Sequence, residues 1–429
     1  MTYEETINYL FEAAPLFQQI GGGAYKEGLS TTFQLDDHFG HPHQQFCCIH
    51  VGGTNGKGST ANTLAAMLQH AGYKTGLFTS PHLIDFRERI RVNGQMIDKK
   101  YVIDFVENER AFFEPLSPSF FEITTALAFK YFADQEIDVA VIEVGLGGRL
   151  DCTNIIQPVL SVITNISFDH TQFLGHTLAA IASEKAGIIK TGVPVVIGET
   201  VPETRKVFEK QAIAVKAPIT FAEESEEIIS TSVSDSGLRH YITSHWGTFD
   251  AELAGDCQVK NANTILHAVE QLQSVFTITT DDVHYAFRHI CEITGLKGRW
   301  QKLQEKPMVI CDAGHNPGGW TYLSRQLHET VKSYGKVRIV LGFAADKDVT
   351  SILSTLPTEA QYYWSRASVR RAMDEKELKQ QADTLGLSGN AFSSVSEAYQ
   401  QALSEAAPSD FIYVGGSCFV VADLLSSLI

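Results

Sequence analysis

Short apolar runs alternate with helix-like patterns along much of the chain. The apolar runs have the length of buried parallel strands, and they lie at residues 46–51, 138–144, 159–166 and 193–197. Residues 120–132 and 178–189 have the spacing of helices. This alternation predicts an α/β fold with a central, mostly parallel sheet, in which ligands bind at the carboxyl ends of the strands.

The pattern changes twice. Between about residues 201 and 260, Ser, Thr and Glu dominate and the apolar runs become short, which predicts a small antiparallel insertion. After the glycine-punctuated segment 295–299, strands and helices start again. Because 429 residues exceed one ordinary core, we expect a larger domain at 1–296 and a smaller, Rossmann-like α/β domain at 297–429. An amphipathic helix at the amino terminus is expected to end at Gly21-Gly-Gly23.

A glycine-rich turn connects the strand at 46–51 to a helix. Gly53, Gly56 and Gly58 let backbone N–H groups approach phosphate, and Lys57 adds a positive charge at the helix start. Ser59 can then place its hydroxyl on a magnesium ion. The spacing differs from the Walker pattern, which has Ser or Thr directly after the lysine. The turn predicts a triphosphate site, and the alternative is a glycine-rich turn without a ligand.

Two polar residues stand near the ends of apolar strands. Glu143 requires a cation or hydrogen-bond donors, because a buried lone carboxylate is costly. Placed level with Ser59 and Ser80, it favours a magnesium site, since Mg²⁺ prefers carboxylate, hydroxyl and phosphate oxygens. The alternative is a carboxylate that caps the next helix or pairs with Arg149.

His170 follows another strand, and Lys185 lies on the inward stripe of the next helix, between Ile181 and Ile189. An inward lysine must snorkel, meet a carboxylate, bind phosphate or lose its charge, and snorkelling is the simplest of these outcomes.

In the second domain, Asp312 and His315 follow the first strand, and Asn316-Pro317 is a helix-start signal. Arg299 could bind a phosphate with two hydrogen bonds. The segment 415–417 is either a similar ligand loop or a turn.

Composition and charge limit the partners and the cellular compartment that we expect. A net charge of −16 disfavours nucleic-acid and anionic-membrane partners, and no apolar run is long enough to span a bilayer. The acidic amino terminus is unlike a signal region, so we expect a cytoplasmic protein. Seven scattered cysteines without a Cys-x-x-Cys pair indicate reduced, buried thiols.

Many of these motifs together resemble the folylpolyglutamate synthase/dihydrofolate synthase family of the Mur-ligase superfamily. The resemblance rests on residues 53–59, 79–83, 121–122, 143–154, 169–170, 184–187, 298–299 and 312–317. It implies a P-loop ATP-binding domain followed by a glutamate-ligase domain. It also implies a cytoplasmic, monomeric ligase that adds L-glutamate to dihydropteroate or reduced folates through an acyl phosphate.

The resemblance also implies roles for individual residues. The nucleotide would be bound by Asn55, Gly56, Lys57, Gly58, Ser59, Asn261, Arg299 and Asp312. Ser59, Ser80 and Glu143 would hold one Mg²⁺, and His170 with a carbamylated Lys185 would hold a second; a monovalent cation is a further expectation. The catalytic set would be Lys57, Glu143, His170, Lys185 and His315. The substrate-binding set would be Pro81, His82, Phe121, Glu122, Asp151, Cys152 and Ser417.

Some positions depart from the family pattern. Members often have alanine or serine where Cys152 stands and alanine at Gly53 and Gly314, so we expect the fine shape of the pterin pocket to differ from that of such members. The segments around Ser80 and Asp151 favour a bifunctional enzyme over one that only extends glutamate chains. The alternatives are another Mur-type amide ligase and a P-loop NTPase switch, which would not need the second domain.

Overall fold

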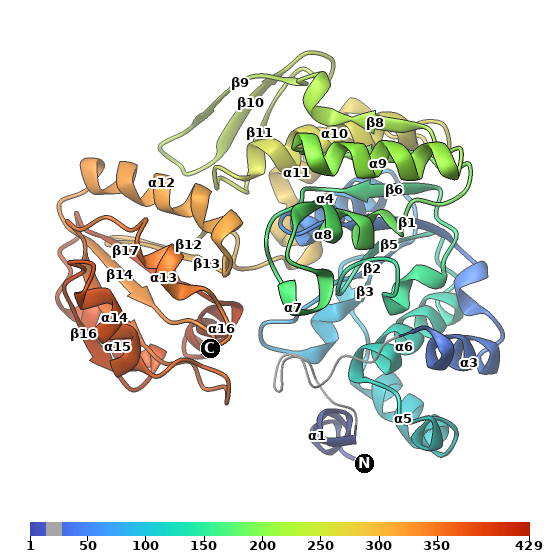
Figure 1. Ribbon diagram of the computed structural model, residues 1–429, viewed down its shortest axis with the longest axis horizontal. Helices are drawn as coiled ribbons and strands as arrows, with labels where there is room; N and C mark the ends of the chain where they lie inside the picture. Colours follow the sequence, from blue (N-terminus) through green and yellow to red (C-terminus); the bar gives the residue numbers. More distant parts are fainter. Residues whose placement is uncertain (14–27) are drawn as a thin grey trace. The chain divides into compact units, whose positions relative to one another are not determined.

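The chain divides into two units, each with its own sheet and core, in the computed structural model, which describes residues 1–13 and 28–429 (Figure 1). The first unit contains residues 1–234, 238–252 and 258–296, and the second contains 235–237, 253–257 and 297–429. The expected stop at Gly21-Gly-Gly23 lies outside the described residues.

The first unit is built on an eight-stranded sheet with the order β4-β3-β2-β5-β1-β6-β7-β8. Its strands are β1 (Cys47–Gly52), β2 (Thr75–Phe78), β3 (Ile90–Val92), β4 (Gln95–Met96), β5 (Val139–Glu143), β6 (Leu160–Ile163), β7 (Val195–Ile197) and β8 (Ile219–Phe221). The pairs from β2 to β8 are parallel, and β3 and β4 add an antiparallel edge. The mostly parallel sheet is therefore confirmed.

Alternate residues of the central strands enter different cores, because side chains of a strand alternate between its faces. Val139 and Val141 of β5 join a core with α4 (Lys57–His70), α10 (Gln258–Leu272) and α11 (Thr280–Thr294). Ala140 and Ile142 join a core with α1 (Tyr3–Ala13), α3 (Ser30–His38), α5 (Lys99–Phe113) and α6 (Phe120–Asp134). Helices thus cover both faces, which explains the continuous apolar runs.

The predicted antiparallel insertion is correct only for its second half. Residues 202–221 form α9 (Pro202–Ala214) and β8, which extends the parallel sheet beside β7. The antiparallel sheet consists of β9 (Ile228–Val233), β10 (Arg239–Thr243) and β11 (Thr248–Ala251). The prediction was wrong at its start because α9 buries few side chains and therefore has a weak apolar stripe.

Shorter helices shape the loops of the first unit. They are α7 (Thr171–Leu174), α8 (Leu178–Ala186) and the 3-10 helices η2 (Pro42–Gln44), η3 (Phe86–Arg89), η4 (Glu114–Leu116), η5 (Cys152–Ile155) and η6 (Ala222–Glu224). Of these, η5 and α8 lie next to residues that the sequence marks for chemistry.

The second unit has a six-stranded sheet with the order β12-β13-β17-β14-β15-β16, in which only the pair β12 and β13 is antiparallel. Its strands are β12 (Gln301–Glu305), β13 (Met308–Asp312), β14 (Val337–Leu341), β15 (Gln361–Ser365), β16 (Gly389–Phe392) and β17 (Phe411–Gly415). Its helices are α12 (Pro317–Ser333), α13 (Val349–Leu353), α14 (Glu375–Asp383), α15 (Val395–Ser404) and α16 (Cys418–Ser426). The α/β architecture of both parts is therefore as the sequence pattern predicts.

Two compositional expectations can be compared with the structure. Within residues 1–13 and 28–429, no helix combines the length and apolarity needed to cross a membrane. The seven cysteines are free thiols, but Cys47 is exposed, so the expectation of uniformly buried thiols was wrong. Cys47 opens β1, where only the following residues turn into the cores.

Candidate active site

The glycine-rich turn lies between β1 and α4 and is fixed by its neighbours. Gly56 has φ +84°, and a Cβ there would lie 2.2 Å from Asn261 Oδ1, so only glycine fits. Lys57 Nζ donates to Thr54 O at 3.0 Å, and Asn62 donates to Gly58 O. The turn therefore has the backbone geometry of an anion cradle at a helix start.

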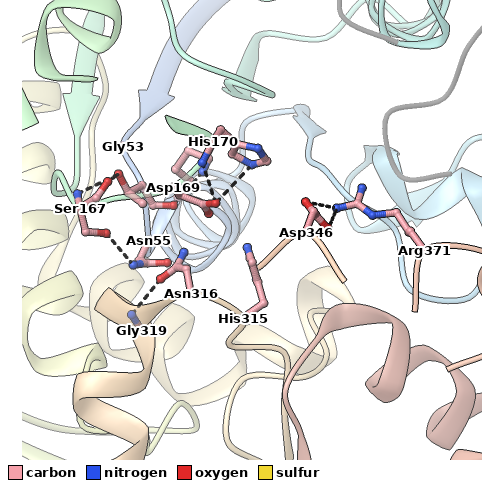
Figure 2. Close-up of polar contacts among 12 residues, drawn as sticks. Gly53, Asn55, Ser167, Asp169, His170, His315, Asn316, Gly319, Asp346 and Arg371 are labelled. Carbon is pink, nitrogen blue, oxygen red and sulfur yellow. Dashed lines mark hydrogen bonds and ion pairs between the residues drawn. The ribbon is translucent and has the colours of Figure 1, made fainter. Parts of the chain in front are cut away.

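A second segment holds the turn from the side of β6. Asn55 N donates to Asn165 Oδ1 at 3.0 Å. Asn55 Nδ2 donates to Ser167 Oγ at 3.3 Å, as Figure 2 shows. Thr164 Oγ1 donates to Asn55 O. These bonds fix the turn without using the backbone N–H groups of Lys57, Gly58 and Ser59, which begin α4 and, as the first N–H groups of a helix, have no acceptor within it.

Ser59 and Asn261 are joined through α10. Ser59 is buried, and its Oγ accepts from Gln258 Nε2 at 3.3 Å. Asn261 Nδ2 donates to Gln258 Oε1 at 2.9 Å. The structure thus brings Asn261 to the P-loop from a helix about two hundred residues away.

Glu143 is the last residue of β5 and is 4% exposed. Its Oε2 accepts from Ser80 N at 3.0 Å, so the carboxylate and Ser80 meet at the carboxyl ends of the neighbouring strands β5 and β2. The Ser80–Pro81 peptide is cis. Arg149, the alternative partner for Glu143, forms an ion pair with Glu184 at 2.9 Å. The structure therefore brings Glu143 and Ser80 together, and the magnesium site stays a prediction.

Lys185 is 4% exposed on α8, and its Nζ donates to Gly53 O of the P-loop at 2.8 Å. Snorkelling was therefore the wrong alternative, because a side chain that reached solvent could not contact Gly53. Burial, and then the charge of Lys57, lower the pKa of Lys185 to about 7. A lysine in this state has a substantial neutral fraction at neutral pH and can act as a nucleophile.

Asp169 and His170 lie beyond β6. His170 has φ +49° and precedes α7, and its backbone N–H donates to Asp169 Oδ1 at 2.9 Å (Figure 2). The charge of Asp169 raises the pKa of Lys185 and so opposes the effect of burial. Asp169 was missed as a site residue, although the Asp-His pair in the sequence was the signal that could have found it.

Three residues that the resemblance assigns to the pteroate pocket, Phe121, Asp151 and Cys152, lie in or against the loop 145–151 and the η5 helix that follows it. A Cβ on Gly145 would lie 2.4 Å from the ring of Phe121, so the loop packs directly on that ring. Asp151 caps η5 with its carboxylate, and burial raises its pKa. Burial also holds the pKa of Cys152 well above the usual thiol value, so the thiol stays protonated.

Two other predicted substrate residues have structural partners. Glu122 closes a capping box at the start of α6, where its carboxylate accepts from Ser119 N at 2.7 Å. His82 Nδ1 accepts from Arg89 Nε at 2.7 Å. Burial, and then the charge of Arg89, lower the pKa of His82 to about 3, so the imidazole is neutral with its proton on Nε2.

In the second unit, Asp312 ends β13 and accepts from Trp300 N at 2.7 Å and Gly314 N at 2.8 Å. Burial raises the pKa of Asp312, and the charge of Arg299 opposes this effect. His315 Nδ1 lies 3.2 Å from Ala313 O. Asn316 caps α12 by accepting from Gly319 N, as the Asn-Pro signal predicts (Figure 2).

Three basic residues, two of which the sequence did not reveal, act on the start of α16. Ser417 is 3% exposed and caps this helix. Burial raises the pKa of the neighbouring Cys418 thiol, and the charges of Arg371, Arg299 and Lys347 oppose this effect. Arg371 also pairs with Asp346 at 2.7 Å (Figure 2). Arg371 and Lys347 come from segments far from α16 in the sequence, so no local pattern could have found them, whereas Arg299 was among the predicted residues.

Side-chain groups of His and acidic residues close enough to share a metal ion occur elsewhere among the described residues. They are Asp36 with Asp37 and His41, and Glu227 with His245 and Glu270. Neither group contains Ser59, Ser80, Glu143, His170 or Lys185. Of the predicted magnesium residues, Ser59, Ser80 and Glu143 carry the hydroxyl and carboxylate oxygens that Mg²⁺ prefers, whereas Lys185 would offer oxygens only as a carbamate.

Comparison with known proteins places this arrangement in a family. Residues 51–269 match the Mur ligase middle domain, and residues 298–418 match the Mur ligase glutamate ligase domain. The two units thus have the domains of Mur-type amide ligases.

Similar proteins indicate to which family of Mur ligases the chain belongs. The chain is 34% identical to dihydrofolate synthase/folylpolyglutamate synthase of Bacillus subtilis over 94% of this chain and 95% of the relative. It is 33% identical to a probable bifunctional folylpolyglutamate synthase/dihydropteroate synthase of Haloferax volcanii over 99% of this chain, and it spans 50% of the length of that relative. The chain belongs to the folylpolyglutamate synthase/dihydrofolate synthase family of the Mur ligase superfamily.

Solved structures share the whole fold. FolC of E. coli in complex with DHPP and ADP has a TM-score of 0.84 and 29% identity, covering 100% of this chain and 98% of that chain. A bifunctional folylpolyglutamate synthase/dihydrofolate synthase with Mn, AMPPNP and L-glutamate bound has a TM-score of 0.81 and 28% identity, covering 100% of this chain and 98% of that one.

Proposed function

We propose that this protein is an ATP-dependent, ADP-forming ligase that joins L-glutamate to dihydropteroate and to reduced folates. The observation that carries the proposal is the contact between buried Lys185 and the P-loop carbonyl of Gly53, beside the Glu143–Ser80 pair. A nucleotide switch needs a P-loop and a metal, but it has no use for a neutral buried lysine at that place. A ligase that transfers a phosphoryl group to a carboxylate needs additional positive charge there, which a second divalent ion bound by a carbamylated Lys185 would supply.

The nucleotide would be held by the first unit. Asn55, Gly56, Lys57, Gly58 and Ser59 would bind the phosphates, with Asn261 supporting Gly56. Ser59, Ser80 and Glu143 would hold one Mg²⁺, which prefers hydroxyl and carboxylate oxygens; the contact of Ser80 N with Glu143 supports this assignment. Magnesium supplies Lewis-acid neutralisation of the transferring phosphoryl group.

Lys185 fits a carbamate. A neutral amine can add to CO₂ with loss of one proton, which gives an N-linked carboxylate in place of an ammonium group. The new oxygens of this anion, with the His170 imidazole, would form a second divalent site. Lys57 would remain the cation that faces the phosphates. The substrate carboxylate would attack the γ-phosphate, ADP would leave, and the glutamate amine would displace phosphate from the acyl phosphate.

The amino-acid substrate would bind to the second unit. Glutamate carries two carboxylates, and the start of α16 offers Ser417, Arg371, Lys347 and Arg299 in one region. Asp312 and His315 lie on the same unit at the end of β13 and could interact with the glutamate amine or the nucleotide. Arg371 and Lys347 were not among the residues that the sequence identified.

The pteroyl substrate would bind beside Phe121, with Pro81, His82, Glu122, Asp151 and Cys152 around it. The neutral His82 ring offers one N–H donor, since Arg89 occupies its other nitrogen. Asp151 and Glu122 are held by backbone groups, so they would shape the pocket more than contact the substrate.

An ADP-release assay tests the proposal. ADP should form only when ATP, L-glutamate and a pteroyl acid are all present, with dihydropteroate and tetrahydrofolate compared as acceptors. ADP release without glutamate would favour the NTPase alternative. Absence of turnover with dihydropteroate would leave glutamate-chain extension as the sole activity. A monomeric state and a monovalent-cation requirement stay predictions, for which light scattering and a potassium titration are the measurements.

A further inference from the structure

His50 is a polar residue in the middle of β1 and is completely buried. Its Nε2 lies 2.8 Å from Thr153 Oγ1, and Thr153 Oγ1 donates to Asp151 Oδ1 at 2.5 Å. A hydroxyl has one proton to give, and the carboxylate receives it. Thr153 therefore accepts from His50, which places the imidazole proton on Nε2.

The other nitrogen of His50 is left without a partner. Among the described residues, no hydrogen-bond donor reaches the buried Nδ1. Burial, and then the nearby charge of Lys190, lower the pKa of His50 to about 3, so the ring stays neutral. A buried acceptor without a donor costs stability. An apolar residue would avoid that cost but could not donate to Thr153, so the hydrogen bond from Nε2 is the feature that accounts for a polar residue here.

The far end of this hydrogen-bond chain fixes a loop. The second carboxylate oxygen of Asp151 accepts from Leu146 N at 2.8 Å, and Oδ1 also accepts from Thr153 N at 3.0 Å. The carboxylate therefore ties the start of the loop 145–151 to η5. Since η5 contacts β1 through Thr153 and His50, these hydrogen bonds fix the position of the loop relative to the strand that leads into the P-loop.

The loop contacts two parts of the proposed site. Gly145 packs on the ring of Phe121, and a Cβ on Gly148 would lie 2.8 Å from Glu184 O. Arg149 N donates to Glu184 O at 2.7 Å. Glu184 directly precedes Lys185, so the loop lies between the pteroyl pocket and the helix with the buried lysine.

We propose that His50 is a positioning residue that sets the loop 145–151 through Thr153 and Asp151, and thereby sets the affinity for the pteroyl substrate. His50 touches neither substrate nor nucleotide. The inference rests on the proposed function, because it assigns the loop to the pteroyl pocket of that site.

Two pairs of matched substitutions test the role. Thr153→Val removes the hydroxyl and keeps the shape, whereas Thr153→Ser keeps the hydroxyl. His50→Gln places an amide nitrogen near the position of Nε2, whereas His50→Asn places it near Nδ1. Thr153→Val and His50→Asn should raise the KM for the pteroyl substrate about tenfold, the effect of one lost hydrogen bond. Thr153→Ser and His50→Gln should stay near the wild type.

The KM for ATP distinguishes positioning from general damage. It should change less than about twofold in all four variants, because the P-loop keeps its own bonds to Asn165 and Thr164. A parallel rise in both KM values, or equal effects within each matched pair, would overturn the proposal. Thermal unfolding of each variant verifies that the fold is intact.

A measurement without substrate tests the chain itself. In nitrogen-15 NMR of the full-length, histidine-labelled protein, the signal that disappears in His50→Gln should be that of a neutral imidazole with a protonated Nε2 across the neutral pH range; His82 has the same state and should keep its signal in this variant. If the signal lost in His50→Gln is that of an imidazole protonated on Nδ1 or of an imidazolium, the hydrogen-bond chain is refuted. Lack of wild-type turnover would instead refute the proposed function, and the role of His50 with it.

Discussion

Replacement of Lys185 tests the assignment of the buried lysine most directly. Lys185→Ala removes both the contact to Gly53 and the amine that would become a carbamate. Loss of a metal-binding anion should lower kcat about a hundredfold or more, since even outer-shell partners of a metal cost 10- to 100-fold. A short carboxylate such as acetate should partly restore turnover, because it can occupy the vacated space and supply the missing oxygens.

The magnitude of the pKa shift explains why this lysine can react. With a pKa of about 7, Lys185 is about 90% neutral at pH 8, whereas a lysine with the ordinary value of 10.5 is about 0.3% neutral. The reactive fraction is therefore larger by about 300-fold. Turnover in CO₂-free buffer should rise when bicarbonate is added. At a fixed CO₂ concentration this gain in turnover should become smaller as the pH falls below about 7, because Lys185 is then mostly protonated.

The same shift predicts a stability effect. The folded pKa lies below the unfolded one, so the unfolded chain binds more protons between pH 7 and 10.5, and stability rises with pH in that window. At pH 7 the uncarbamylated lysine costs about 4 kcal/mol, and Lys185→Met should recover about 3 kcal/mol after the loss of one hydrogen bond. Urea unfolding in CO₂-free buffer measures this difference.

Lys190→Met is the matched control. Burial lowers the pKa of Lys190 as well, but its Nζ donates to Asn154 O and not to the P-loop. This variant should keep phosphoryl transfer and need no carboxylate. Full activity of Lys185→Ala, or the absence of a carbamate signal after incubation of the wild type with ¹³CO₂, would refute the reasoning.

Three further substitutions test other parts of the site. Lys57→Ala should abolish ADP formation, and unchanged turnover would remove the P-loop from the mechanism. Gly56→Ala should destabilise the fold by about 1–3 kcal/mol in thermal unfolding and weaken ATP binding, because its φ is +84° and the new Cβ would clash with Asn261; unaltered ATP affinity in calorimetry would contradict this. Arg371→Met should raise the KM for glutamate about tenfold with little effect on the KM for ATP, whereas exposed Arg366→Met should leave both near the wild type.

The sequence determined the elements whose signals are local. The apolar runs of β1, β5, β6 and β7 were readable because strands buried on both faces have no polar positions. The strand-end residues Ser80 and Glu143 followed from the same pattern, since parallel strands place their carboxyl ends at one edge. The antiparallel insertion was placed too early because α9 has a weak apolar stripe.

Only the tertiary structure decided how distant groups meet. Lys185 could be placed on an inward face from sequence, but its contact with Gly53 and its lowered pKa depend on the packing of α8 against the P-loop. The cations around α16 and the bond from His50 to Thr153 join residues from separate segments. Periodicity reports which face of an element is buried, whereas burial and charge act through space, so the protonation states of this site exist only in the folded chain.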